Sequence, residues 1–333
     1  MFPVQAPSPF DLLKMSVLAI DLGATKLAAA VFESNGKILS GEYKLLKNDE
    51  GKDAGTLFKE VIGRNIAQFE NTKSPVKAIG ICVPGIYFPE TKTVWAPNIE
   101  GWENYPLEKT IAEVTSLPVF VDNDRTCCVL GATWKGSAVG YKNVVYLAVG
   151  TGIGAGIMID GRVLYGNDNI AGAIGWMALS DTYRKGYEQF GNFEYHASGD
   201  GIARIANEYL AQMDDYAGEM QPPVSSYDVF EAYDRKDPVA TLVLDECVEF
   251  WGKAVANLVS LFNPEIIVLG GGVFGPAAQF KDRIYRESKK WAQPIAVERV
   301  KLVNTKLGNE TALYGAANLA IRKLKNIKHK NEK

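Results

Sequence analysis

The sequence predicts a two-lobed α/β protein, and three observations support this. At 333 residues the chain is longer than one hydrophobic core usually organises, so two lobes are expected. Strand-like and helix-like segments alternate along it, as in mixed α/β domains. A strand–glycine turn–strand pattern near the N-terminus recurs after residue 143, which suggests two lobes derived from one ancestral unit.

The repeat starts with residues 16–38, which read as a strand, a glycine turn, a second strand, a turn and a strand-like end. The same order returns after residue 143. Aligning Leu18 with Leu147 places Asp21 on Gly150 and Gly23 on Gly152. Few residues are identical, but the element order and the glycine positions match, so we expect one such hairpin in each lobe.

The remaining segments extend each lobe with helices and further strands. In the first half we expect helices at residues 54–70, 107–115 and 127–134, strands at 77–83 and 119–121, and a loop at 94–103. In the second half we expect helices at 200–216, 240–262 and from about 276, strands at 265–269 and 299–304, and a final helix at 311–325.

The final helix should pack back on the first lobe. The expected N-terminal lobe is therefore 16–123 plus 311–333, and the C-terminal lobe is 124–310. Residues 1–15 form a leader without the basic start and apolar core of a signal peptide, and they need not be ordered.

Composition and charge exclude several classes of function. The net charge is −3, and no basic stripe occurs before the last dozen residues, so nucleic acid is not an expected partner. The uncharged run at 144–159 is shorter than the roughly 20 residues that span a bilayer, so no membrane association is expected either. Four scattered cysteines without C-x-x-C spacing indicate a reduced, cytoplasmic protein.

Two glycine turns are candidate phosphate sites. In the first, Asp21, Gly23, Thr25 and Lys26 follow a strand; backbone N–H groups of such a turn can approach phosphate oxygens, and a strand-end Asp can hold hydrated Mg²⁺. Alone this motif also fits a purely structural hairpin. The matched position of the second turn, at residues 150–156, favours phosphate binding for both.

The segment 270–275 (GGGVFG) fits the G-x-G-x-x-G dinucleotide fingerprint after a strand. That fingerprint needs a following strand that ends in an acidic residue able to bind ribose. The next strand here, 299–304, ends in Asn304, so a nucleotide loop at a helix start is favoured over NAD binding.

Asp122, Asn123 and Asp124 end a strand and begin a helix. Helix N-termini keep carboxylates ionised, and an ionised Asp can accept a proton from a hydroxyl that attacks phosphorus. A pair of N-cap residues is the structural alternative for this segment.

Taken together, these residues resemble the ROK family of bacterial sugar kinases and sugar-responsive repressors. The resemblance covers residues 16 to about 322. The motifs that carry it occur in this order: Asp21-x-Gly-x-Thr-Lys, Pro84-Gly85, Ala96-Pro97-Asn98 with Gly101-Trp102, Asn123-Asp124, Gly150-Thr-Gly-x-Gly, Val268-Leu-Gly-Gly-Gly and Leu313-x-Gly315-Ala-Ala.

The resemblance implies a two-lobed actin-like (ribonuclease H-like) ATPase and sugar kinase fold, with a duplicated mixed sheet and flanking helices. It further implies ATP and Mg²⁺ as cofactors, Mg²⁺ being held by Asp21 through water. Asp124 would be the general base, and Asn98, Asn123 and Asp124 would hold sugar hydroxyls. The nucleotide would be held by three loops: Asp21, Gly23, Thr25 and Lys26; Gly150, Thr151, Gly152 and Gly154; and, for adenosine, Gly270, Gly271 and Gly272.

The chain departs from the family at one motif. The family usually has Gly-Glu-x-Gly-His followed by a Cys-rich zinc motif, whereas Ala173 and Trp176 stand here in place of Glu and His. No Cys lies between Cys128 and Cys247, so no zinc is expected. Glu194 still matches a downstream family Glu; it is a candidate sugar ligand, or a surface helix residue.

The sequence therefore predicts an ATP-dependent kinase that transfers the γ-phosphate to a hydroxyl of a hexose or hexose derivative. The alternative is a catalytically silent sugar-binding or sugar-sensing protein without a DNA-binding domain, suggested by the replaced Glu and His. A repressor is disfavoured because only about 15 residues precede the first strand. We expect a homodimer and, because Ala173 cannot grip a hydroxyl, poor activity on glucose.

Overall fold

The computed structural model describes residues 15–23, 26–46, 54–96 and 99–331, which form two compact units. The first unit comprises residues up to 135, 166–170 and 310–333, and the second comprises 136–165 and 171–309. The expected boundary after residue 123 differs from this division, because α4 (Asp124–Trp134) packs against α12 (Thr311–Asn331). The final helix, α12, groups with the first unit.

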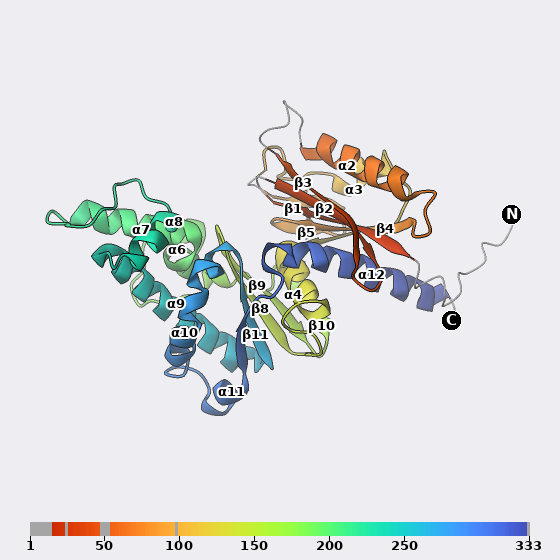
Figure 1. The fold of residues 1–333 in the computed structure, drawn as a ribbon. Helices are drawn as coiled ribbons and strands as arrows, with labels where there is room; N and C mark the ends of the chain where they lie inside the picture. Colours follow the sequence, from red (N-terminus) through yellow and green to blue (C-terminus); the bar gives the residue numbers. More distant parts are fainter. Residues whose placement is uncertain (1–14, 24–25, 47–53, 97–98, 332–333) are drawn as a thin grey trace. The chain divides into compact units, whose positions relative to one another are not determined.

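Each unit contains a five-stranded mixed sheet, and the two sheets have the same topology (Figure 1). In both, the first strand pairs antiparallel with the second and parallel with the fourth. The first sheet has the order β3 (Ile38–Leu45), β2 (Lys26–Glu33), β1 (Ser16–Leu22), β4 (Val76–Val83), β7 (Val119–Asn123). The second has the order β10 (Arg162–Val163), β9 (Ile153–Ile159), β8 (Val144–Val149), β11 (Ile266–Gly270), β12 (Lys301–Asn304). The matching orders confirm the predicted duplication.

Helices cover both faces of the first sheet (Figure 1). Side chains alternate along β1, so that Leu18 and Ile20 pack with α2 (Ala54–Phe69) and α3 (Leu107–Ala112). Val17 and Ala19 point the other way, into the layer formed by α12. A strand buried on both faces has no polar alternation, which explains its continuous apolar run. A small hairpin, β5 (Ile86–Phe88) and β6 (Thr93–Trp95), follows β4.

Glycines let α12 approach its neighbours closely. A Cβ at Gly80 in β4 would lie 1.9 Å from the Ala316 carbonyl oxygen, and a Cβ at Gly315 would lie 1.7 Å from that of Cys127 in α4. Real Cβ atoms never come so close, so only glycine fits at these positions. The close contact places α4, and with it Asp124, at a fixed position beside the sheet.

The second unit packs helices around the long α9 (Pro238–Phe262), whose Trp251 is fully buried. Asp237 caps α9 by accepting from the N–H groups of Val239 and Ala240. The other helices of this unit are α5 (Tyr187–Phe190), α6 (Asn192–Ala197), α7 (Gly199–Gln212), α8 (Ser226–Asp234), α10 (Lys281–Ser288) and α11 (Pro294–Arg299).

Most predicted elements are present, with two differences. The segment from Pro276 begins as a 3₁₀ helix (Pro276–Phe280) and becomes α-helical only in α10. Residues 94–103, predicted as a loop, begin within β6. The uncharged run at 144–159 forms β8 and β9, and none of the helices in the described ranges is both long and apolar enough to cross a bilayer.

Candidate active site

The candidate residues of the first unit lie at the carboxyl ends of parallel strands. Asp21 in β1 pairs with Cys82 in β4, and Cys82 pairs with Asp122 in β7. Asp124 follows immediately as the first residue of α4. Carboxyl ends of parallel strands are where open α/β sheets bind ligands, so the register alone brings these carboxylates to a site-forming edge.

Asp124 combines exposure with an altered acidity. Its surface is open to solvent, although protein surrounds it on the other sides and raises the pKa of the carboxyl by desolvation. The charge and N–H of Arg125 act in the opposite direction, and this N–H donates to Asp124 Oδ1 over 2.8 Å. A carboxylate with a raised pKa at the start of a helix suits a general base.

Asn123 is the N-cap of α4. Its Oδ1 accepts from the Thr126 N–H over 2.8 Å, and its amide nitrogen is 3.5 Å from the Asn169 carbonyl oxygen. The capping alternative therefore holds for Asn123 but not for Asp124, which lies one position into the helix. Capping uses one lone pair of Asn123 Oδ1 and the Asn169 carbonyl accepts one amide N–H, so one N–H and one lone pair of Asn123 remain for a ligand.

Asp21 is a second carboxylate of the first unit whose pKa is raised. Burial raises its pKa to about 6; a hydrogen bond from Cys82 and the Lys26 charge lower it, and the Asp124 charge raises it. A bound cation would favour the ionised form of both carboxylates, so Asp21 fits the predicted Mg²⁺. The Gly23 N–H donates to the Lys26 carbonyl over 2.8 Å and closes the turn. Thr25 and Asn98 lie outside the described residues.

In the second unit, the turn between β8 and β9 exposes backbone donors. The Gly150 N–H donates to Gly152, and the Gly150 carbonyl accepts from the Gly199 N–H over 2.7 Å, which ties the turn to the start of α7. Within the described part of the chain, the N–H groups of Thr151 and Gly152 donate to no protein group. Two successive unpaired N–H groups form a concavity that binds anions, so this turn fits a phosphate. Gly154 lies in β9, opposite Ala148.

The Gly270 loop contains glycines with different functions. A Cβ at Gly270 would lie 2.0 Å from the Tyr146 hydroxyl, and one at Gly271, where φ is +90°, would lie 2.3 Å from the Val149 carbonyl oxygen. These two glycines allow close packing on β8. At Gly272 a Cβ would meet nothing within 4 Å, so this is the position in the loop where the backbone is open to a ligand.

Glu194 is not a surface helix residue. It lies on α6, is half-buried, and its Oε2 accepts from the Ile153 N–H over 2.6 Å. Desolvation raises its pKa, whereas the Ile153 N–H lowers it. The structure therefore brings Glu194 to the turn that the sequence proposed for phosphate, a proximity that sequence analysis missed because the two segments are about 40 residues apart.

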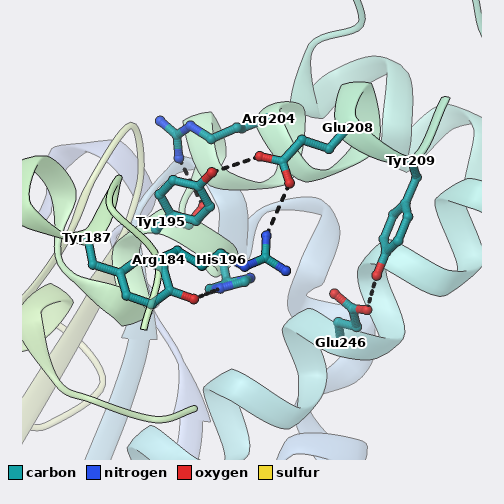
Figure 2. Close-up of polar contacts among 8 residues, drawn as sticks. All are labelled: Arg184, Tyr187, Tyr195, His196, Arg204, Glu208, Tyr209 and Glu246. Atoms are coloured by element: carbon teal, nitrogen blue, oxygen red, sulfur yellow. Dashed lines mark hydrogen bonds and ion pairs between the residues drawn. The ribbon is translucent and has the colours of Figure 1, made fainter. Parts of the chain in front are cut away.

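An aromatic and ionic cluster surrounds His196 (Figure 2). The buried His196 Nε2 is 2.7 Å from the Tyr187 hydroxyl, and its ring stacks on Phe250. Burial lowers the pKa of His196 to about 4, which keeps it neutral. Over the described residues, no group of three or more His, Cys, Asp and Glu side chains has an arrangement able to hold a metal ion.

From the sequence alone, we expect four aromatic residues to pack together in place of zinc ligands: Trp176, Tyr187, Phe190 and Phe193. Tyr187 and Phe193 are buried, and Phe190 packs with the Arg204 guanidinium 4.3 Å from its ring centre. Trp176 is 57% exposed and takes no part in this packing, so that expectation was wrong for Trp176. It ends a short 3₁₀ helix (Ile174–Trp176) in which Ile174 and Gly175 are buried, whereas the Trp176 side chain faces solvent.

Cys82 was not identified from the sequence, although this residue of β4 makes a hydrogen bond with Asp21 on the neighbouring strand β1. A buried apolar strand such as 77–83 gives no signal that one of its members touches a site. Its position two residues before Pro84-Gly85, at the strand end, is the only indication that the sequence offers.

Comparisons with known proteins agree with this arrangement. The ROK family pattern matches residues 17–323. A glucokinase from Halalkalibacterium halodurans is 31% identical over 95% of this chain and 98% of its own length. The crystal structure of a ROK hexokinase from Thermus thermophilus is 30% identical with a TM-score of 0.77, covering 93% of this chain and all of that one.

A ROK glucokinase from Streptomyces griseus, solved in complex with glucose and AMPPNP, is 27% identical with a TM-score of 0.72. The match covers 92% of this chain and 99% of that one. These likenesses, together with the duplicated mixed sheets, confirm the predicted actin-like fold. Because the family pattern matches residues 17–323 and the Halalkalibacterium glucokinase is 31% identical over 95% of the chain, the chain belongs to the ROK family.

Proposed function

We propose that this protein is an ATP-dependent sugar kinase that phosphorylates a hydroxyl of a hexose or hexose derivative. The observation that carries the proposal is the Asp124 carboxylate, which is open to solvent at the start of α4 and has a raised pKa. The relatives named glucokinase and hexokinase, and the glucose and AMPPNP bound to one of them, support sugar and ATP as the two substrates.

In this proposal Asp124 moves the proton. Its carboxylate takes the proton of the sugar hydroxyl while the hydroxyl oxygen bonds to the γ-phosphorus and the bond to the β–γ bridging oxygen breaks, leaving ADP. The raised pKa makes the ionised Asp124 carboxylate a stronger base than an ordinary aspartate. Asn98, the Asn123 amide and Glu194 are the further residues that we propose as ligands of sugar hydroxyls.

The nucleotide would be held by backbone groups. The free N–H groups of Thr151 and Gly152 would receive phosphate oxygens, and the open backbone at Gly272 would accommodate the adenosine. Asp21, through water, would hold Mg²⁺, which when bound neutralises charge on the phosphates. Phosphate transfer from ATP and four free cysteines favour a cytoplasmic location.

An ADP-release assay over a panel of sugars tests the proposal: glucose, mannose, fructose, xylose, N-acetylglucosamine and N-acetylmannosamine. Asp124→Asn should lower kcat by roughly 100-fold or more while AMPPNP and sugar binding persist, because a general base contributes about 10²- to 10⁴-fold. Asp181→Asn, at an exposed position, is the matched control and should leave kcat unchanged. Unaltered turnover in Asp124→Asn would contradict the assigned base, and sugar binding without any ADP release would favour the silent alternative.

A further inference from the structure

A buried cysteine of the first unit lies between two carboxylates of the candidate site. Cys82 in β4 is the register partner of Asp21 in β1 and of Asp122 in β7. Register partners on neighbouring strands point to the same face of a sheet, so these three side chains form a row. The row faces α4 and α12, because Cys82 belongs to the core cluster that these two helices cover.

Close packing of α12 brings a second thiol to Cys82. This is Cys127 in α4, which, like Cys82, is 0% exposed. Ala316 of α12 approaches β4 at Gly80, two residues before Cys82 and on the same face. The preceding residue, Gly315, approaches the Cys127 carbonyl. One turn of α12 therefore holds β4 and α4 together where the two cysteines lie.

The hydrogen bonds of these thiols have one consistent direction. Cys82 bonds with Asp21 on one side and with Cys127 on the other. An ionised carboxylate only accepts, so the single S–H of Cys82 donates to Asp21. The S–H of Cys127 is then the donor to the Cys82 sulfur. Within the described ranges, no nitrogen or oxygen group donates to the Asp21 side chain, so the thiol is its one fixed donor there.

We propose that Cys82 is a positioning residue for the proposed magnesium site: its thiol, supported by Cys127, fixes one oxygen of the Asp21 carboxylate and leaves the other for a metal-bound water. The inference rests on the proposed function, in which Asp21 holds Mg²⁺ through water. The terminal torsion of an aspartate is broad, so a carboxylate without a donor must be ordered when the metal binds. A carboxylate that is already held avoids this cost.

The first test uses metal-free protein and needs no catalysis. Urea unfolding at pH 8 in EDTA is measured for the wild type, Cys82→Ala, Asp21→Ala and the double variant, a cycle that isolates the interaction of the pair. Cys82→Ala should lower the folding equilibrium constant more when Asp21 is present than when it is replaced. The two ratios should differ by about 2- to 10-fold, as expected for one net hydrogen bond.

Metal affinity is the second readout. Mn²⁺ prefers the same oxygen ligands as Mg²⁺, and its binding to the AMPPNP-loaded protein is measured by electron paramagnetic resonance. Cys82→Ala should raise the Mn²⁺ Kd by about 2- to 10-fold, because the carboxylate loses one hydrogen bond. Cys82→Ser should restore the affinity, since a hydroxyl can donate to Asp21 and accept from Cys127. Cys127→Ala keeps the donor and loses only its support, so its effect should be smaller.

Cys247→Ala is the matched control. Cys247 is a buried cysteine of the second unit whose Sγ is 3.6 Å from the His196 carbonyl oxygen. Its truncation should lower the Tm, as the loss of a buried thiol does, and leave the Mn²⁺ Kd unchanged. Circular dichroism verifies that each variant is folded.

The outcomes separate the inference from the function on which it rests. Additive effects of Cys82→Ala and Asp21→Ala overturn the positioning role, as does a Mn²⁺ Kd in Cys82→Ala equal to that of Cys247→Ala. Failure of folded Cys82→Ser to restore metal affinity also overturns it. Coupling and weakened Mn²⁺ binding in Cys82→Ala support the positioning role even if no panel sugar is phosphorylated; in that case only the proposed function fails.

Discussion

At the scale of single residues, the site is built from groups that destabilise the folded chain. Asp21 is held at the end of β1 with a pKa of about 6, far above the ordinary value of 3.8. A carboxyl with a raised pKa in the folded state contributes most to stability below pH 3.8, and this contribution is lost as the pH rises through about 6. At neutral pH the ionised Asp21 therefore opposes folding.

Asp21→Asn should accordingly stabilise the protein at pH 8. The pKa difference corresponds to about 2 kcal/mol of unfolding free energy, once partial solvent screening is allowed for. Urea unfolding at pH 8 and at pH 3.5 measures this, and the gain should vanish at the lower pH. Asp181→Asn is the control and should show no pH-dependent difference; equal stability of Asp21→Asn and the wild type at pH 8 would contradict the argument.

The side chains of Ala173 and Trp176 should determine the preference for glucose. Ala173 and Trp176 stand where the family usually has Glu and His, and the exposed indole of Trp176 offers one N–H donor and no acceptor. Restoring both side chains, Ala173→Glu with Trp176→His, should raise kcat/KM for glucose. A hydrogen bond to a charged group is worth about 1.5–3 kcal/mol, so a gain of roughly 10- to 150-fold is expected.

Steady-state kinetics over the sugar panel test this preference. The double variant should gain most on glucose and least on sugars substituted near the anomeric carbon. If the wild-type protein already has its highest kcat/KM for glucose, the specificity argument is wrong although the kinase assignment stands.

At the scale of elements, the position of Asp124 depends on how closely helices pack. The backbone of α12 touches that of α4 at Gly315, where a Cβ would lie 1.7 Å from the Cys127 carbonyl oxygen. Any side chain there must push α12 away from α4 and from the sheet beneath it. Overpacking of this kind usually costs about 1–3 kcal/mol or more.

Gly315→Ala should therefore destabilise the protein, although alanine favours a helix by about 1 kcal/mol over glycine. Gly63→Ala provides the matched comparison, because Gly63 lies within α2 and a Cβ there would meet nothing within 4 Å. Thermal unfolding should show a lower Tm for the first variant and an equal or higher Tm for the second. Equal effects of the two substitutions would show that helix propensity rather than close packing governs position 315.

At the scale of the whole molecule, two units with the same sheet order each supply part of the proposed chemistry. The first contributes carboxylates and the second contributes backbone N–H groups and Glu194. The region around His196 in the second unit has an aromatic and ionic cluster in place of the family's zinc motif (Figure 2).

The whole chain should therefore fold without zinc. Elemental analysis of purified protein should find far less than one zinc per chain, and dialysis against EDTA should leave the Tm and the sugar-dependent ADP release unchanged. The physical reason is that hydrophobic burial of Tyr187 and Phe193, with the Tyr187–His196 hydrogen bond, provides the stabilisation that soft ligands on zinc provide elsewhere. One tightly held zinc per chain, or unfolding on chelation, would refute this.

The sequence by itself determined the repeat, most helices and strands, and the residues that we propose to carry chemistry. It could do so because apolar periodicity and glycine turns are local signals, and because Asp124 lies next to a strand end and a helix start. The sequence left Glu194 open between a sugar ligand and a surface helix residue, and the packing expected of Trp176 was wrong, because burial depends on segments distant in sequence.

Only the tertiary structure decided which of these residues meet. The parallel register of β1, β4 and β7 places Asp21 beside Cys82 and near Asp124, and close packing at Gly152 and Gly175 brings Glu194 to the Ile153 N–H. The raised pKa of Asp21 and the contact of Glu194 with the Ile153 N–H arise from desolvation and from contacts between segments distant in sequence. The local sequence shows neither the pKa of Asp21 nor the contact of Glu194, because both depend on whether water or distant parts of the protein surround the side chain.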